Sequence, residues 1–435
     1  MVGSRSRQKN LLLRCLNLTR YNLGDFMNDN SRPKANSRFI LLLFLGMILG
    51  GIFGSVAGRP FAFIDLLGDL FLGALKMLIL PLIASSMIVG VSSLGDVRKL
   101  GRLGGFTLVY YLSTTVMAVI LGLVLVNLIR PGASSPMETA AAMEVAEYSF
   151  LDVIRGIIPN RFFGAIISEG QVLPLIFFSL FLGSVITMVG EKGRPVLSFF
   201  EGLFHVSMKM THLVVATAPI GVFALVATQM GEAGGWTGFY PVLKSLGLYS
   251  ITVLAGLFLH GSVTLPAILF FVGRRSPLKF MRDMIEPLVL SFSTASSSAT
   301  LPVTMESLEK KAGVDPKVGT FVLPLGATIN MDGTALYEAI AAVFIAQSYG
   351  IDLSLPAMIT IVLTATLAAI GAAGIPQAGL VTMVMVLHSV GLPIEGVGMI
   401  LAVDWFLDRC RTTVNVWGDA VGAAVVERVS IRPSD

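Results

Sequence analysis

Long apolar runs separated by short polar segments dominate the first two thirds of the chain. A transmembrane helix needs about 20 mostly apolar residues. Clear runs of that kind lie at residues 39–58, 64–94, 105–130, 206–231 and 242–273. A further apolar region, 149–190, is interrupted by prolines and glycines, which predicts several short helices there. The pattern therefore predicts an all-α protein that crosses a membrane several times.

Two later segments are apolar but fit re-entrant hairpins better than full spans. Residues 280–305 hold the serine-rich stretch SFSTASSSATLPVT, and basic clusters flank them on both sides. Residues 354–391 hold the broken stretch AAIGAAGIPQAG and contain no Asp, Glu, Lys or Arg. The alternatives are an interfacial loop for the first segment and two short spans for the second. Non-helical backbone at membrane depth must be buried in protein or line a cavity.

Each expected hairpin precedes an apolar helix with polar residues near its middle. Residues 318–349 follow the first hairpin and contain the stretch INMDGTALYE, in which Gly333 predicts a helix break. Residues 397–427 follow the second hairpin. Two such units that enter from opposite sides indicate an inverted repeat. In transporters of that kind the binding site lies between the repeats, near the midplane.

Composition and charge support this topology. The chain is 54% hydrophobic and 13% charged, with a net charge of +4, whereas ordinary soluble domains carry about 25% charged residues. Basic clusters at 96–102 and 273–282 and an acidic segment at 131–147 satisfy the positive-inside rule if both termini are cytoplasmic. We therefore expect a multi-pass protein of the plasma or inner membrane with a basic cytoplasmic extension over residues 1–38, and no nucleic-acid partner.

A polar stripe follows one face of the last apolar helix. It consists of Asp404, Asp408, Arg411, Asn415 and Asp419, which are spaced 4, 3, 4 and 4 residues apart. Each charge at the bilayer centre costs about 2.5–3.5 kcal/mol on insertion scales. The stripe therefore predicts a protein-lined polar interior, and the alternative is a seam that only joins helices.

The residue types in the stripe suggest roles. Arg411 has a planar fork that suits a carboxylate, and Asp408 is an acceptor for an ammonium group. Together they would bind a small zwitterion with an additional carboxylate. Oxygen ligands for a hard cation such as sodium would come from Asn415, Asp419, Asn330 and Asp332.

Other chemistry has little support. Cys15 and Cys410 do not suggest a disulfide framework, and the histidines at 205, 212, 260 and 388 lack metal-ligand spacing. We expect these histidines to serve packing or interfaces. No nucleophile–base pair or phosphate-binding loop is recognisable in the sequence, so we do not expect an enzyme.

Four ordered motifs resemble the dicarboxylate/amino acid:cation symporter family, which includes archaeal aspartate transporters and excitatory amino acid transporters. They are SSSATLPVT (296–304), NMDGTALYE (330–338), GAAGIPQAG (371–379) and DRCRTTVNVWGDA (408–420). The resemblance covers the chain from about residue 39. It implies an all-α glutamate-transporter fold with eight transmembrane segments, two re-entrant hairpins and inverted repeats, assembled as a homotrimer.

The same resemblance implies a division of labour between a fixed scaffold and a moving transport domain. The scaffold would comprise residues 39–104 (helices 1 and 2) and 131–232 (helices 4 and 5). The transport domain would comprise 105–130, 242–273, 280–305, 318–349, 354–391 and 397–427. Transport would follow an elevator mechanism, with the second hairpin as the extracellular gate.

The resemblance also implies the residues of the substrate pocket and three sodium sites. The substrate would contact Ala295, Ser296, Ser297, Thr334, Ile375, Gly379, Asp408, Arg411, Thr412 and Asn415. One sodium ion would use Asp419 with carbonyls of Gly326, Asn330 and Asn415, and a second would use carbonyls of Thr328, Ala369, Ile370 and Ala372. A third would use Tyr111, Thr114, Thr115, Asn330 and Asp332.

Two departures from the archaeal pattern affect coupling. Archaeal members have Arg where this chain has Ala295, and here the comparable cation is Arg409. They have Gln where this chain has Glu338, as excitatory transporters do. We therefore expect Glu338 to couple transport to protons, with potassium coupling as a further option. The alternative is that Glu338 only pairs with Arg411 or Arg409 when substrate is absent.

The residues and the resemblance together predict sodium-driven symport of L-glutamate and L-aspartate. A C4-dicarboxylate lacks the amine that Asp408 would bind, which disfavours such a substrate. Neutral amino acid carriers of the family lack Arg at the position of Arg411, which disfavours that alternative as well. Anion-channel activity is a different class of function that no feature of the sequence isolates.

Overall fold

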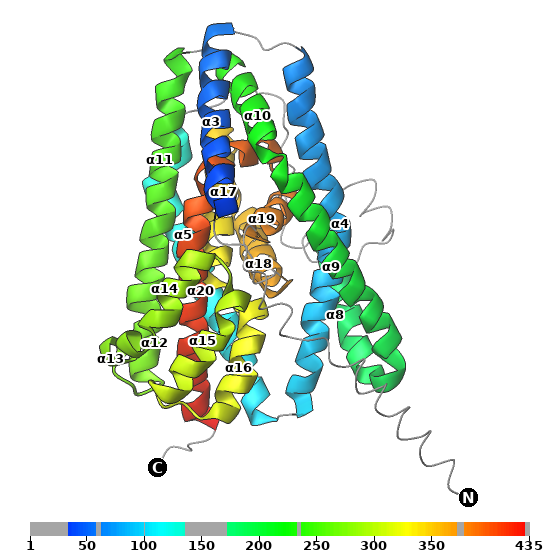
Figure 1. The fold of residues 1–435 in the computed structure, drawn as a ribbon, viewed down its shortest axis with the longest axis vertical. Coiled ribbons are helices and arrows are strands. Elements are labelled where there is room, and N and C mark those ends of the chain that lie inside the picture. The colour runs from blue at the N-terminus through cyan, green and yellow to red at the C-terminus, as the bar shows by residue number, and fades with distance from the viewer. Residues whose placement is uncertain are drawn as a thin grey trace, which may run out of the picture. The chain divides into compact units, whose positions relative to one another are not determined.

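The computed structural model describes residues 34–57, 62–99, 101–134, 172–232, 236–371 and 378–430. It comprises an N-terminal unit, residues 1–42, and a main unit, residues 43–435. Of the N-terminal unit only residues 34–42 are described, and they are helical. Within the described ranges every regular element is a helix (Figure 1), as the sequence predicts. Residues 1–33 of the expected extension (1–38), residues 135–147 of the acidic segment and the first part, 149–171, of the interrupted apolar region lie outside the described residues.

The first helices of the chain are long and apolar. They are α3 (Lys34–Ala57), α4 (Ala62–Lys99), α5 (Arg102–Ile129) with the short turn η1 (Pro131–Ser134), α8 (Val172–Val189), η3 (Gly190–Gly193), α9 (Arg194–Ala216) and α10 (Ala218–Glu232). Helix α4 packs on α8, α9 and α10, whereas α5 packs mainly on helices from the C-terminal half.

The run expected to span at 206–231 belongs to a longer helical segment that is interrupted at Thr217. Helix α9 already begins at Arg194, and α10 begins at Ala218 with Pro219 in its first turn. Proline lacks an N–H group, so it fits the first turn of a helix but not the interior. The backbone N–H of Thr217 bonds the carbonyl of Val214, which closes the turn between α9 and α10.

The next segment contains two helices with a π-helical turn between them. Helix α11 (Trp236–Leu259) leads into the π turn η4 (His260–Thr264) and then into α12 (Leu265–Phe271). Helix α13 (Pro277–Asp283) follows. Pro266 lies in the first turn of α12, directly after the π turn.

A pair of short helices corresponds to the first expected hairpin. Helices α14 (Ile285–Thr294) and α15 (Ser297–Lys310) contact each other and α20 (Val397–Ser430). Ala295 turns the chain with a left-handed backbone conformation, φ 51°. The hydroxyl of Ser296 then caps α15 by accepting a hydrogen bond from the N–H of Ala299.

A broken helix lies at the centre of the main unit. Helices α16 (Pro316–Ile329) and α17 (Asp332–Ser348) are separated by two residues that are not helical. All residues from Asp332 to Ala346 are buried, and α17 contacts α5, α11, α18, α19 and α20. Because its neighbours cover it on all sides, apolar residues can occupy its whole circumference.

Two further helices correspond to the arms of the second expected hairpin. They are α18 (Leu355–Gly371) and α19 (Ala378–Ser389), which pack on each other and on α17. The tip residues 372–377 lie outside the described residues. The turn η5 (Ile394–Gly396) then leads into α20.

Several helical stretches are long and apolar enough to cross a membrane. In the described residues they are Ala62–Ser92, Arg102–Ala133, Pro174–Thr211, Tyr240–Phe271 and Pro316–Ser348, with shorter apolar helices at Leu45–Ala57, Ala218–Thr228 and Leu355–Ile370. Large apolar side chains are exposed along α5 and α11, for example Val109, Leu128 and Phe258. These exposed apolar faces suit a lipid environment.

Candidate functional site

The break between α16 and α17 places polar backbone at the centre of the main unit. Asn330 and Met331 leave the helical conformation, with φ/ψ of −103°/77° and −111°/61°. The side chain of Met331 does not cap the N-terminus of α17. The N–H of Gly333, in the first turn of α17, instead donates to Oδ1 of Asn415 at 2.8 Å. A Cβ atom at Gly333 would lie 2.8 Å from the Arg411 carbonyl oxygen. Only glycine therefore allows the start of α17 to approach α20 so closely.

Four side chains from α5 and the break form one oxygen-rich cluster. Thr115 donates to Oδ1 of Asp332 at 2.7 Å. Thr114 lies 3.3 Å from both Oδ1 of Asp332 and Oδ1 of Asn330. All four residues are buried. The structure thus brings together four of the five residues expected for the third sodium ion.

Tyr111, the fifth residue of that set, makes a different hydrogen bond. Its hydroxyl donates to the carbonyl of Val322 at 2.6 Å. It nevertheless lies next to Gly326, because a Cβ atom at Gly326 would lie 2.7 Å from the Tyr111 hydroxyl. Tyr111 therefore lies beside the backbone of α16 at Gly326.

A second cluster surrounds the carboxylate of Asp419. Asn330 donates to Oδ1 of Asp419 at 2.9 Å. A Cβ atom at Gly326 would lie 2.4 Å from the same oxygen, so the backbone of α16 directly faces the carboxylate. The residues expected for the first sodium ion, Gly326, Asn330, Asn415 and Asp419, all lie at the contact of the break with α20.

The carbonyls expected for the second sodium ion lie at two helix ends. Thr328 is in the last turn of α16, and Ala369 and Ile370 are in the last turn of α18; the two helices contact each other. The carbonyl of Ile370 faces Gly90 of α4, where a Cβ atom would lie 3.0 Å away. Ala372 lies outside the described residues.

Arg411 lies one helical turn from these clusters and is almost completely buried, with 1% of its surface exposed. Its Nη2 atom is 2.8 Å from Oδ1 of Asp408 and 3.1 Å from Oδ1 of Asp404. Its Cζ atom lies 3.8 Å from the centre of the Tyr337 ring. On another side, a Cβ atom at Gly379 would lie 2.9 Å from Nη1. Arg411 is therefore enclosed by α17, α19 and its own helix.

The other residues expected to contact substrate lie around Arg411 or at the first hairpin. Asn415 donates to the hydroxyl of Thr334 at 3.2 Å, and Thr412 donates to the carbonyl of Asp408 at 2.8 Å. Ala295, Ser296 and Ser297 form the tip between α14 and α15 and are buried. Ile375 lies outside the described residues.

Glu338 and Arg409 occupy separate environments. Glu338 is fully buried on α17, and no described residue forms a hydrogen bond of standard geometry with its carboxyl oxygens. The Thr382 hydroxyl and the Arg411 guanidinium are the polar groups that interact with it. Arg409 instead donates to the carbonyls of Phe292 (3.1 Å) and Ser293 (2.6 Å) at the end of α14.

Comparison with known proteins assigns the chain to a family. The profile of the sodium:dicarboxylate symporter family matches residues 39–429. The chain belongs to this family.

Relatives of the symporter include three vertebrate proteins. Excitatory amino acid transporter 3 of Mus musculus is 44% identical over 83% of the chain and 78% of its own length. The protein of the same name from Oryctolagus cuniculus is 41% identical over 92% of the chain and 87% of its own length. Excitatory amino acid transporter 1 of Ambystoma tigrinum is 37% identical, covering 98% and 88%. The symporter is thus a helical, multi-pass membrane protein, and these relatives are transporters, a non-enzyme role.

Three residues of the symporter's site were not assigned from sequence. Asp404 was predicted only as part of the stripe, but it also pairs with Arg411. Tyr337, whose ring faces the guanidinium, had no polar spacing to reveal it. His260, for which we expected a packing or interface role, lies 3.1 Å from Oδ2 of Asp332 with both side chains fully buried. An intramembrane histidine was the available signal.

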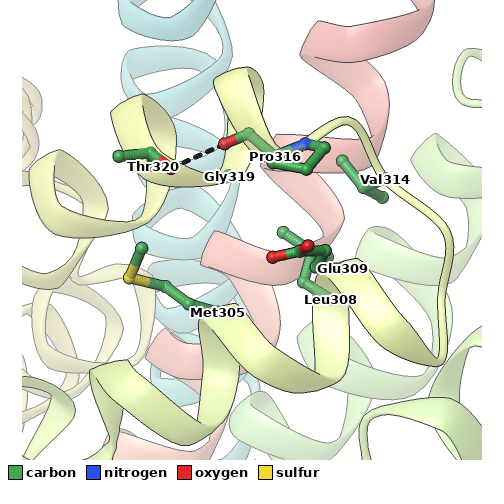
Figure 2. A pocket seen from close by; sticks show the side chains of 7 residues that line it. All are labelled: Met305, Leu308, Glu309, Val314, Pro316, Gly319 and Thr320. Carbon is green, nitrogen blue, oxygen red and sulfur yellow. Dashed lines mark hydrogen bonds between the residues drawn. The ribbon is translucent and has the colours of Figure 1, made fainter.

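One small pocket in the described residues lies away from the site. Figure 2 shows it between α15 and α16, lined by Met305, Leu308, Glu309, Val314, Pro316, Gly319 and Thr320. Its empty volume of about 200 Å³ includes open solvent. None of the residues expected to contact substrate lines this pocket, so it is not the candidate substrate site.

Proposed function

We propose that the protein is a symporter of acidic amino acids, L-glutamate and L-aspartate, driven by sodium. The observation that carries this proposal is the buried Arg411–Asp408 pair of α20 together with two oxygen-rich clusters at the break between α16 and α17. Arg411 would bind the side-chain carboxylate of the substrate, and Asp408 its α-ammonium group. The relatives' names, excitatory amino acid transporters, support the same substrate class.

The charge of the site favours cation coupling. Asp332, Asp404, Asp408 and Asp419 are buried in the described core with Arg411 as the guanidinium among them. Buried carboxylates without compensating charge are unfavourable by several kcal/mol each. An acidic amino acid adds further negative charge. Sodium ions bound at Asp332 and Asp419 would offset it, so that substrate and sodium bind better together than apart.

The geometry also supports coupling through shared residues. Residues 411, 415 and 419 are four positions apart on α20, which corresponds to about 6 Å along the axis per step. Asn415 bonds both the Gly333 N–H and the Thr334 hydroxyl. A sodium ion that orders the break at Asn330 would therefore also order the substrate side of α17.

The remaining features of the family arrangement belong to the same proposal. We propose eight spans with two re-entrant hairpins, a homotrimer, cytoplasmic termini in the plasma or inner membrane, and elevator transport. The packing of α4 on α8, α9 and α10 supports a scaffold, and the packing of α5 on α17 and α20 supports a transport domain. Close contact of Gly379 with Arg411 supports α19 as part of a gate.

The substrate class is tested by uptake of radiolabelled aspartate, glutamate, serine and succinate into proteoliposomes. We expect accumulation of the two acidic amino acids only with an inward sodium gradient. Strong uptake of serine or succinate without aspartate uptake would overturn the substrate assignment. Succinate is the informative competitor, because it would leave Asp408 unpaired.

We propose, as a second part of the function, that Glu338 couples transport to protons and to potassium. Among the described residues no side chain forms a hydrogen bond of standard geometry with its buried carboxyl oxygens, so the group is not committed to a structural partner and can exchange a proton. We expect uptake by the unmodified protein to respond to imposed proton and potassium gradients, and uptake by Glu338→Gln to lose these responses. Identical responses in the two proteins would refute this role.

A further inference from the structure

The π turn η4 leaves a backbone carbonyl without a partner from its own helix. In this turn the N–H of Leu265 bonds the carbonyl of His260, five residues earlier. The same register assigns the carbonyl of Gly261 to the N–H of residue 266. Residue 266 is proline, which has no N–H. An orphaned carbonyl at this depth needs a donor from another element.

Trp417 of α20 supplies that donor. Its indole Nε1 atom donates to the carbonyl of Gly261 at 3.0 Å. The ring is buried, with 3% of its surface exposed, and it packs 5.7 Å from the ring of Phe280. An indole has a single hydrogen-bond donor, its Nε1–H group. This contact therefore holds the π turn at a defined position against α20.

The position of the π turn determines where His260 points. His260 is the first residue of the turn, and its Nε2 atom lies 3.1 Å from Oδ2 of Asp332. An ionised carboxylate only accepts hydrogen bonds, so Nε2 carries the proton. This bond leaves Oδ1 of Asp332 turned toward Thr114 and Thr115. His260 is therefore a partner that orients a proposed ion ligand.

We propose that Trp417 is a positioning residue that sets sodium affinity by holding the π turn and, through it, the His260–Asp332 contact. The proposal rests on the proposed function, since Asp332 is taken there as a sodium ligand. Without the indole donor, the Gly261 carbonyl is left unpaired in the protein interior. The π turn then shifts to recover a partner, and His260 moves away from Asp332.

The test is a sodium titration of purified protein, read as the rise in melting temperature at constant ionic strength with choline as the replacement cation. A ligand that binds the folded state raises stability according to its concentration and affinity. Loss of a partner that orients a metal ligand typically weakens affinity by about 10- to 100-fold. We expect Trp417→Phe, which keeps an aromatic ring but loses the donor, to raise the half-saturating sodium concentration at least threefold. Trp405→Phe on the same helix should leave it unchanged.

A double variant distinguishes this route from general destabilisation. We expect His260→Ala to raise the half-saturating sodium concentration, and Trp417→Phe to add nothing further in that background. A lower melting temperature for Trp417→Phe with an unchanged sodium half-saturation would overturn the proposal. So would full additivity with His260→Ala, because Trp417 would then act by another path, such as its neighbour Gly418. If Trp417→Phe does not fold, an unchanged half-saturation in His260→Ala overturns it.

The outcomes separate this inference from the proposed function. An unmodified protein that shows neither sodium-dependent stabilisation nor sodium-dependent uptake would refute the proposed function itself. An unmodified protein that titrates with sodium, together with a Trp417→Phe variant that titrates identically, would refute only the role of Trp417.

Discussion

Gly326 offers a sharp test of the Asp419 cluster, because a single methyl group there would collide with the carboxylate. A Cβ atom at this position would lie 2.4 Å from Oδ1 of Asp419 and 2.7 Å from the hydroxyl of Tyr111. Real Cβ atoms do not approach other heavy atoms so closely. Gly326→Ala must therefore push Asp419 away from α16 and away from Asn330, which donates to it at 2.9 Å.

The expected magnitude follows from two opposing effects. Alanine in place of glycine stabilises a helix by roughly 0.5–1 kcal/mol, whereas overpacking in a filled interior costs about 1–3 kcal/mol. The net loss in the free energy of unfolding is therefore about 0–2.5 kcal/mol. Disturbing a hydrogen bond to a charged group is worth about 1.5–3 kcal/mol, and each 1.4 kcal/mol is about tenfold in affinity. We expect sodium half-saturation of uptake to rise about 10- to 100-fold.

The assay is aspartate uptake into proteoliposomes as a function of external sodium. Gly319→Ala on the same helix is the matched control, since its nearest neighbour is the flexible end of Leu308 at 3.3 Å. The control should keep the sodium dependence of the unmodified protein. A Gly326→Ala protein with unchanged sodium half-saturation would show that the α16 backbone and Asp419 do not form one ion site.

Further predictions concern packing and substrate recognition. A Cβ atom at Gly54 would lie 2.2 Å from the Ala227 carbonyl oxygen, whereas one at Gly247 meets nothing within 4 Å. Gly54→Ala should therefore lower the free energy of unfolding in detergent by about 1–3 kcal/mol. An effect no larger than that of Gly247→Ala would contradict this. Arg411→Lys keeps the charge but loses the planar fork, so we expect aspartate affinity in radioligand binding to fall at least tenfold, and an unchanged affinity would argue against carboxylate recognition there. Asp408→Asn should weaken aspartate binding and, because it removes the charge that succinate leaves unpaired, reduce the preference for aspartate over succinate; an unchanged preference would contradict its role as the ammonium partner.

The predictions from sequence were most informative where one helix carried a periodic polar pattern. The spacing of residues 404 to 419 placed them on one face of α20, and the structure brings that face to the break between α16 and α17. A helical period fixes which side chains share a face. The stretch around Gly333 gave the position of the break, because an amide and an acid inside an apolar helix need polar partners and the glycine weakens the helix beside them.

Contacts between segments far apart in the chain were not predictable in the same way. The interruption at Thr217 and the π turn at His260 each lie directly before a helix with proline in its first turn, but a proline alone does not determine which kind of turn precedes it. The ring of Tyr337 reaches Arg411 because of the rotation of α17 against α20. No local periodicity encodes that rotation. The contact of His260 with Asp332 likewise joins residues 72 positions apart, so the sequence alone predicts only a packing or interface role for His260.

The central claim is that one buried site couples sodium to an acidic amino acid, and equilibrium binding tests it most directly. Two ligands that share a coupling free energy change each other's affinity by the same factor. Aspartate affinity of the purified protein should rise steeply as sodium replaces choline, and sodium affinity should rise equally with aspartate. An aspartate affinity that is the same in sodium and in choline would contradict the account.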